Sequence, residues 1–199
     1  MGKILIFAVI LIVIYITVFF IPGSVDKFAL NPEKTSEIWR FVTYKFAHLN
    51  IMHLIENIIG LGLIAFIAIE LKTAFSDFSS TYLSSGFLSV LPIWFITSFT
   101  ALGASNAIFG GFGLISQETK KYDIKGWIII LILTLLIFIK SIANFFSYGI
   151  VSEEFIFAFR QSIAHFSGLL FGIGFFFLLI KIKPILTKRK RHILRGDYR

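Results

Sequence analysis

Long runs of apolar residues alternate with short polar segments along most of this chain. A helix that crosses a membrane needs about 20 mostly apolar residues, and the pattern predicts six such spans. We expect them at residues 4–21, 49–71, 82–99, 104–116, 126–146 and 162–182. The sequence therefore predicts an all-α membrane protein with one six-span domain over residues 1–182 and a basic tail over residues 183–199.

The boundaries of these spans follow from turn residues and polar stretches. Pro22 and Gly23 end the first span, and Pro92 predicts a kink in the third. A cleaved signal peptide explains the first run poorly, because the apolar run over residues 4–21 is longer than the roughly 7–15 apolar residues usual for such peptides. Polar or mixed connections are expected at 23–45, 72–80, 100–103, 117–125 and 147–160.

The composition supports a membrane protein and excludes several other classes. Hydrophobic residues make up 57% of the chain and charged residues 15%, whereas soluble domains have about 45–50% and about 25%. The mean hydropathy is +0.87. The chain has no Cys, which excludes a disulfide framework, a thiolate zinc site and a cysteine nucleophile.

The net charge of +8 indicates topology rather than nucleic-acid binding. Thirteen of the 19 Lys and Arg residues lie near the N-terminus, in 72–80, in 117–125 or from Lys181 onward. The positive-inside rule then places both termini in the cytoplasm. The basic run 188–191 suits anionic lipid headgroups of the bilayer. We expect a multi-pass protein, and the small six-span form suits the cytoplasmic membrane of a prokaryote.

Several polar side chains fall within or beside the predicted spans, where ionisable groups are costly and often functional. In the six-span arrangement, His48 and His53 begin span two, Ser105 begins span four and His165 begins span six, all near the external side. Convergence of Ser and His at one depth is what nucleophilic catalysis requires. Glu56 and Asn57 join them in span two.

Helical spacing refines this picture. His53 and Asn57 share one helix face, as do Ser105 and Phe109. Gly168 and Gly172 form a small-residue face on span six that allows a close helix neighbour. Span four carries glycines for the same purpose, and close approach of these spans would bring His165 toward Ser105. These glycines are Gly103, Gly110, Gly111 and Gly113.

Each feature alone also has a plain structural explanation. A serine in a membrane helix commonly bonds back to its own carbonyls, and small-residue faces commonly serve packing only. A metal site is a further alternative, but no H-E-x-x-H motif occurs and histidines five apart do not share a face. We therefore expect neither a metal nor another cofactor. The metal alternative would use His48, His53, Glu56 and His165.

Three segments of the chain resemble the rhomboid intramembrane serine proteases. The first begins with Trp39-Arg40, continues through Thr43 and Phe46, and ends with the spacing His48-x-x-x-x-His53-x-x-x-Asn57. The second is Gly103-Ala104-Ser105-Asn106-Ala107-Ile108-Phe109-Gly110, and the third is Ala164-His165-x-x-Gly168-x-x-x-Gly172. Their order and spacing agree with the family over about residues 1–182.

The resemblance implies a role for each matching residue. Ser105 would be the nucleophile, and His165 the general base and then the acid. His53 and Asn57 would donate hydrogen bonds to the oxyanion together with the Ser105 backbone N–H. His48, Gly103, Gly168 and Gly172 would support the site, and Trp39 and Arg40 would brace the first external loop.

Two positions depart from the family pattern. Asn106 stands where the family usually has Gly, and Phe109 stands where it usually has Tyr stacked on the catalytic histidine. Neither departure removes a reacting group, so they affect fine geometry and rate more than activity.

The residues alone favour a Ser–His dyad. Partial burial disfavours the charged imidazolium, so His165 would be the neutral base that Ser105 requires. No acidic residue is expected at the right depth to form a triad, and packing against Phe109 would orient the ring.

The substrate would be a transmembrane helix whose external end contains weak helix formers, because a helical peptide hides its carbonyls. The phenylalanine-rich segment 144–160 is expected to form an apolar loop that caps the site and moves to admit substrate. Two alternatives remain open: a non-proteolytic rhomboid-like protein that binds membrane helices, and a small proton or metal transporter. The oligomeric state is open.

Overall fold

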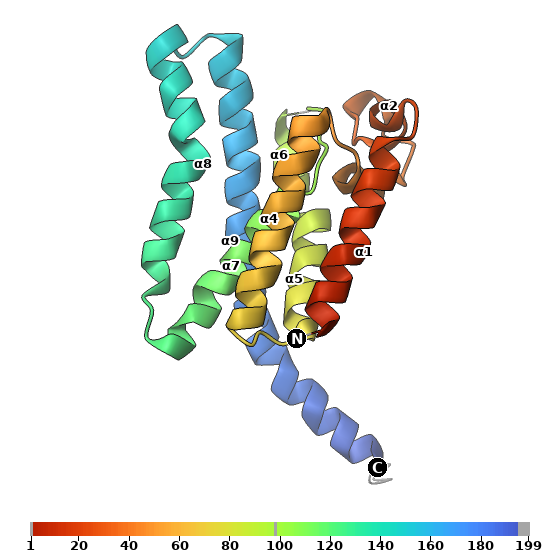
Figure 1. The fold of residues 1–199 in the computed structure, drawn as a ribbon, viewed down its shortest axis with the longest axis vertical. Coiled ribbons are helices and arrows are strands. Elements are labelled where there is room, and N and C mark those ends of the chain that lie inside the picture. The colour runs from red at the N-terminus through yellow and green to blue at the C-terminus, as the bar shows by residue number, and fades with distance from the viewer. Residues whose placement is uncertain (1, 98, 195–199) are drawn as a thin grey trace.

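A computed structural model describes residues 2–97 and 99–194, and every regular element within them is a helix (Figure 1). The all-helical class predicted from the sequence is therefore confirmed. Six longer helices make up most of the molecule: α1 (Gly2–Phe19), α4 (Ile51–Glu70), α5 (Phe75–Leu88), α7 (Ser105–Glu118), α8 (Gly126–Tyr148) and α9 (Glu153–Leu194). The connections contain α2 (Ser24–Phe28), η1 (Pro32–Lys34), α3 (Arg40–Thr43), η2 (Tyr44–Phe46), α6 (Leu91–Thr97) and η3 (Thr119–Tyr122).

The six longer helices alternate in direction. In Figure 1 the start of α1, the α4–α5 connection, the α7–α8 connection and the end of α9 lie at the lower end. The long α1–α4 connection and the α8–α9 connection lie at the upper end. The start of α1 and the end of α9 are therefore on the same side of the bundle.

Four helical segments are long and apolar enough to cross a membrane: α1, α4, α8 and the part of α9 from Glu153 to Ile182. The other two, α5 and α7, have 14 residues each. At 1.5 Å per residue each extends about 21 Å, which is shorter than the hydrocarbon core of about 30 Å. Most side chains of α7 are buried, because α4, α5, α8 and α9 pack around it.

The main hydrophobic core joins α1, α4, α5 and α7. Tyr15 of α1 and Tyr82 of α5 are fully buried in it, and their hydroxyls are hydrogen-bonded at 2.5 Å. Buried polar groups need such partners in an apolar interior. The apolar face of α1 packs beside this pair through Ile4, Ala8 and Leu11.

The predicted boundaries of the third span are wrong. The segment 72–80, read as a polar break, already contains the first turns of α5, which begins at Phe75. The hydroxyls of Ser79 and Ser80 donate to carbonyls one turn earlier, so these polar residues are satisfied inside the helix. Pro92 does not kink one long helix: α5 ends at Leu88, and Pro92 is the second residue of α6.

The predicted outer loop over 147–160 is also wrong, and so is the loop-like cap over 144–160. Helix α8 continues to Tyr148 and α9 begins at Glu153, so the connection spans only residues 149–152. The backbone turns at Gly149, which has a φ of 82°. Phenylalanine rings hold the two helix ends together, with Phe145 and Phe155 centred 5.8 Å apart.

Candidate active site

The segment before Ser105 is held by the connection between α1 and α4. The backbones of Leu30 and Ala101 exchange two hydrogen bonds of 2.9 Å, and the Gly103 N–H donates to the Tyr44 carbonyl at 3.0 Å. Gly103 has a φ of 93°, a conformation that favours glycine. Ser105 then begins α7, so its N–H belongs to the first turn, which has no carbonyl partner within the helix.

Arg40 fixes that long connection from inside. Its side chain is buried, donates to the Ala29 carbonyl at 2.8 Å and pairs with Glu37 at 2.6 Å. Beside it, the Thr43 hydroxyl donates to the Phe28 carbonyl at 3.1 Å. Trp39 is half exposed on the outer surface of the same connection.

Glycines bring α7 and α9 into backbone contact. A Cβ on Gly172 would overlap the carbonyl oxygen of Gly110, and one on Gly168 would lie 2.5 Å from that of Asn106. This is the close approach expected from the small-residue faces of the two helices. One turn above on α9, the His165 ring stacks on Phe109 of α7, with centroids 4.7 Å apart and planes at 25°.

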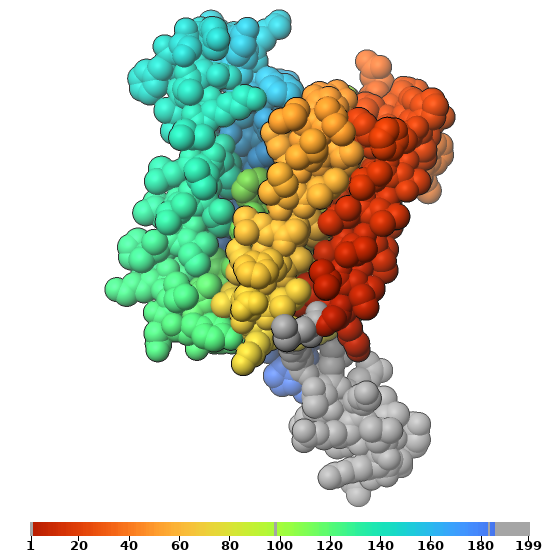
Figure 2. Space-filling model, in the orientation of Figure 1, coloured from red at the N-terminus to blue at the C-terminus, as the bar shows by residue number. Residues whose placement is uncertain are grey.

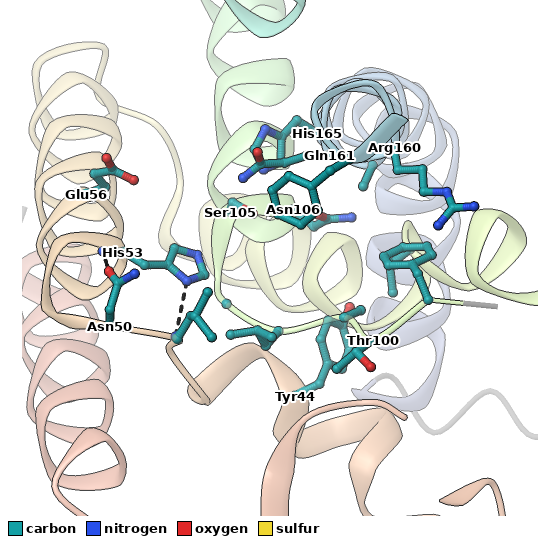
Figure 3. A pocket seen from close by; sticks show the side chains of 18 of the residues that line it. Tyr44, Asn50, His53, Glu56, Thr100, Ser105, Asn106, Arg160, Gln161 and His165 are labelled. Carbon is teal, nitrogen blue, oxygen red and sulfur yellow. Dashed lines mark hydrogen bonds between the residues drawn. The ribbon is translucent and has the colours of Figure 1, made fainter. Parts of the chain in front are cut away.

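A cavity of about 590 Å³ opens between α4, α7 and α9, and Ser105, His53 and His165 all line it (Figure 3). On the face shown in Figure 2 the surface is hollowed between α4 and the upper parts of α8 and α9. The remaining lining includes Tyr44, Asn50, Glu56, Asn106, Lys140, Arg160 and Gln161.

His53 and Asn57 of α4 lie beside Gly103, and of the two only His53 is among the residues that line the cavity. Asn50 caps α4 by accepting a hydrogen bond from the His53 N–H at 2.9 Å. A Cβ on Gly103 would lie 2.6 Å from the His53 ring and 3.8 Å from Asn57 Nδ2. The Asn57 amide donates to the His53 carbonyl at 2.7 Å, and Asn57 is buried.

His48 occupies the turn before α4 and does not line the cavity. Its Nδ1 lies 3.1 Å from the Phe46 carbonyl oxygen. Its ring contacts Tyr15 and His53, with centroids 5.2 Å and 5.3 Å away. In the part of the chain that the structure describes, no group of three or more His, Cys, Asp or Glu residues is arranged to hold a metal ion.

Asn106 anchors the start of α7 to the end of α5. Its side-chain amide donates to the Ser89 hydroxyl at 3.1 Å. The Ser167 hydroxyl of α9 donates to the Ser89 carbonyl, so three helices meet at this point. The residue that departs from the family's usual Gly thus makes a buried contact of its own.

Ser105 and His165 line the same cavity. Among residues 2–97 and 99–194, no hydrogen bond joins the Ser105 hydroxyl to the His165 ring, and Glu56 forms no ion pair. Catalytic hydrogen bonds are commonly long before substrate binds. In Figure 3 Glu56 lies on α4, across the cavity from His165 on α9.

Sequence reasoning missed six polar residues of the cavity: Tyr44, Asn50, Thr100, Lys140, Arg160 and Gln161. A signal for one of them was present, because Gln161 precedes His165 by four residues and so shares its helix face. Lys140 and Tyr44 reach the cavity from α8 and η2, and their placement depends on tertiary packing.

Comparison with known proteins agrees with this architecture. A family model for the Rhomboid domain matches residues 35–182. RHOMBOID-like protein 7 of Arabidopsis thaliana is 31% identical over 104 residues, which is 50% of this chain and 33% of that protein. The matched region thus covers about a third of the relative's length. The match to the Rhomboid domain extends over most of the chain, and the chain belongs to the rhomboid family.

Proposed function

We propose that this protein is an intramembrane serine endopeptidase with a Ser105–His165 dyad. The observation that carries the proposal is that Ser105, at the first position of α7, and His165, stacked on Phe109, line the same cavity. A base beside a serine, held by packing and open to a cavity, is the arrangement that nucleophilic catalysis needs.

In the proposed reaction, His165 takes the proton from the Ser105 hydroxyl as Oγ attacks the substrate carbonyl carbon. The carbon–nitrogen bond then breaks, and His165 gives that proton to the leaving amine. A water molecule, activated by the same histidine, hydrolyses the acyl-enzyme and frees Ser105. The negative charge on the carbonyl oxygen would be stabilised by the Ser105 N–H, His53 and Asn57.

We further propose that all six long helices traverse the bilayer or its interior, with both termini in the cytoplasm and the cavity near the external side. The protein would then be a multi-pass protein of a cytoplasmic membrane. The substrate would be a transmembrane helix that enters the hollow between α4 and the α8–α9 pair and unwinds there. Unwinding is required because helical carbonyls are already hydrogen-bonded.

The test is labelling of the detergent-purified protein with a fluorophosphonate probe. We expect the wild type to be labelled and Ser105→Ala and His165→Ala to be unlabelled. Ser79→Ala, which removes a half-buried serine of α5 outside the cavity, is the matched control and should label like the wild type. If the folded wild type is not labelled, the dyad is not active and the non-proteolytic, helix-binding alternative replaces the protease.

A further inference from the structure

The cavity carries charges that the proposed dyad does not use. Lys140 of α8 and Arg160 of α9 both line it, and in the described part of the chain neither forms an ion pair. Glu56 lines the wall formed by α4, and Figure 3 shows it on the side away from Arg160. The cavity therefore has an acidic wall and a basic wall, with Ser105 and His165 between them.

The two cations face the cavity because of helix geometry. Phe157, Arg160, Gln161, Ala164 and His165 form one stripe of α9, and all of them line the cavity. Lys140 precedes Ser141, which is buried against α9 by a hydrogen bond of 2.7 Å to Ser162. Lys140 lies about 100° around α8 from Ser141, and it lines the cavity beside this α8–α9 contact.

We infer that Lys140 and Arg160 form a subsite that selects substrates with an acidic side chain near the scissile bond. The inference rests on the proposed protease function and adds the substrate class. Both cations are exposed and line the cavity, so a carboxylate bound between them would form charge-assisted hydrogen bonds.

The position of this acidic residue follows from the α9 stripe. Arg160 lies five residues before His165, a rise of about 7.5 Å along the helix. An extended peptide advances about 3.3 Å per residue. The acidic residue is therefore expected two or three positions from the scissile bond, on the side that leaves the cavity past Arg160.

The test measures binding, so that it does not depend on cleavage. The ligands are fluorescent transmembrane peptides with a central Gly–Ser segment. Each peptide carries one Asp, or one Asn as the matched neutral residue, at one of the three positions on either side of the Gly–Ser segment. Their dissociation constants for Ser105→Ala protein are measured in zwitterionic detergent. We expect the best-placed Asp peptide to bind about tenfold more tightly than its Asn partner.

Variants assign the effect to the two cations. Arg160→Gln with Lys140→Gln should reduce the Asp preference to less than twofold, while Lys3→Gln, which removes an exposed cation outside the cavity, should keep it. Arg160→Glu with Lys140→Glu should prefer a Lys peptide. Thermal melting of each variant checks that it is folded.

Three results would overturn the inference. One is equal binding of Asp and Asn peptides at all positions, and another is an Asp preference that survives loss of both cations. The third, measured after anionic lipid is added to the detergent, is weaker binding of the Asp and Asn peptides alike that is not seen in the double variant; this would assign the cations to lipid phosphate. If the wild type lacks fluorophosphonate labelling while the Asp preference holds, the protease proposal fails and the basic subsite of Lys140 and Arg160 stands.

Discussion

In the described structure the His165 ring stacks on Phe109, with centroids 4.7 Å apart, and has no hydrogen bond, so we propose that Phe109 orients it. Phe109→Ala should lower the rate of peptide cleavage about 10–100-fold, since small misplacements of a reacting group cost rate steeply. Phe109→Tyr keeps the ring and should stay near the wild-type rate. Both are measured as kcat on a transmembrane substrate.

The matched control is Phe171→Ala. It removes a ring of α9 that stacks on Phe175 of the same helix rather than on His165. It should leave kcat within about twofold of the wild type, because no reacting group moves. An unchanged kcat in Phe109→Ala would show that stacking does not orient the histidine.

Lys45 is a buried lysine whose charge should make the stability of the protein depend on pH. It lies in the α1–α4 connection, is only 1% exposed, and its ammonium lies 3.2 Å from the Phe87 centroid with no hydrogen-bond partner among the described residues. Burial lowers the pKa of Lys45 from its ordinary 10.5 to about 7. The folded protein therefore carries the cost of an unpaired buried cation below that pH.

The lowered pKa of Lys45 makes the free energy of unfolding increase with pH. Between about pH 7 and about pH 10.5 the unfolded chain binds more protons at Lys45 than the folded chain, so the free energy of unfolding rises with pH. Lys45→Met should raise Tm most at about pH 6, with the gain shrinking as pH approaches 10. Lys3→Met is the exposed control, and an equal gain at every pH would contradict this account.

The contact between α7 and α9 depends on single glycines. A Cβ on Gly172 would meet backbone atoms of Gly110, whereas a Cβ on Gly174 would have nothing within 4 Å. Gly172→Ala should therefore destabilise the protein by about 1–3 kcal/mol, as overpacking does. Gly174→Ala should be neutral or stabilising by up to about 1 kcal/mol, because it replaces glycine within a helix.

Thermal melting of the two variants, together with substrate cleavage, measures this effect. Gly172→Ala should also lower activity, since it moves His165 and Ser105 relative to each other, whereas Gly174→Ala should keep it. Equal melting temperatures for the two variants would show that the α7–α9 contact adjusts without cost.

Sequence patterns predicted the helices better than their ends. The predicted 49–71 and 126–146 spans agree closely with α4 and α8, because both are long apolar runs bounded by polar residues or glycine. The start of α5 was missed because its first turns are rich in Ser, which the structure accommodates through bonds back to the helix. The start of α9 was missed because Glu153 and Glu154 suggested a loop.

For the candidate site too, some residues could be predicted from the sequence and others could not. Ser105, His53, Asn57 and His165 could be identified from local motifs, since each occurs in a spaced pattern along one segment. The bridge between Leu30 and Ala101 and the approach of Lys140 to the cavity could not. They join segments that are far apart in sequence, and only the packed helices bring them together.

The topology of the entire bundle gives the last prediction. Both ends of the described chain lie on one side of Figure 1, and from the excess of Lys and Arg on that side we predict that it faces the cytoplasm. The chain has no Cys, so maleimide found on the protein purified after labelling reports the introduced cysteine alone. In intact cells a membrane-impermeant maleimide should label Glu33→Cys and Ser152→Cys. It should label Lys3→Cys and Lys125→Cys only after permeabilisation. The reverse pattern would invert the orientation, and labelling of Lys3→Cys without Lys125→Cys would exclude six crossings.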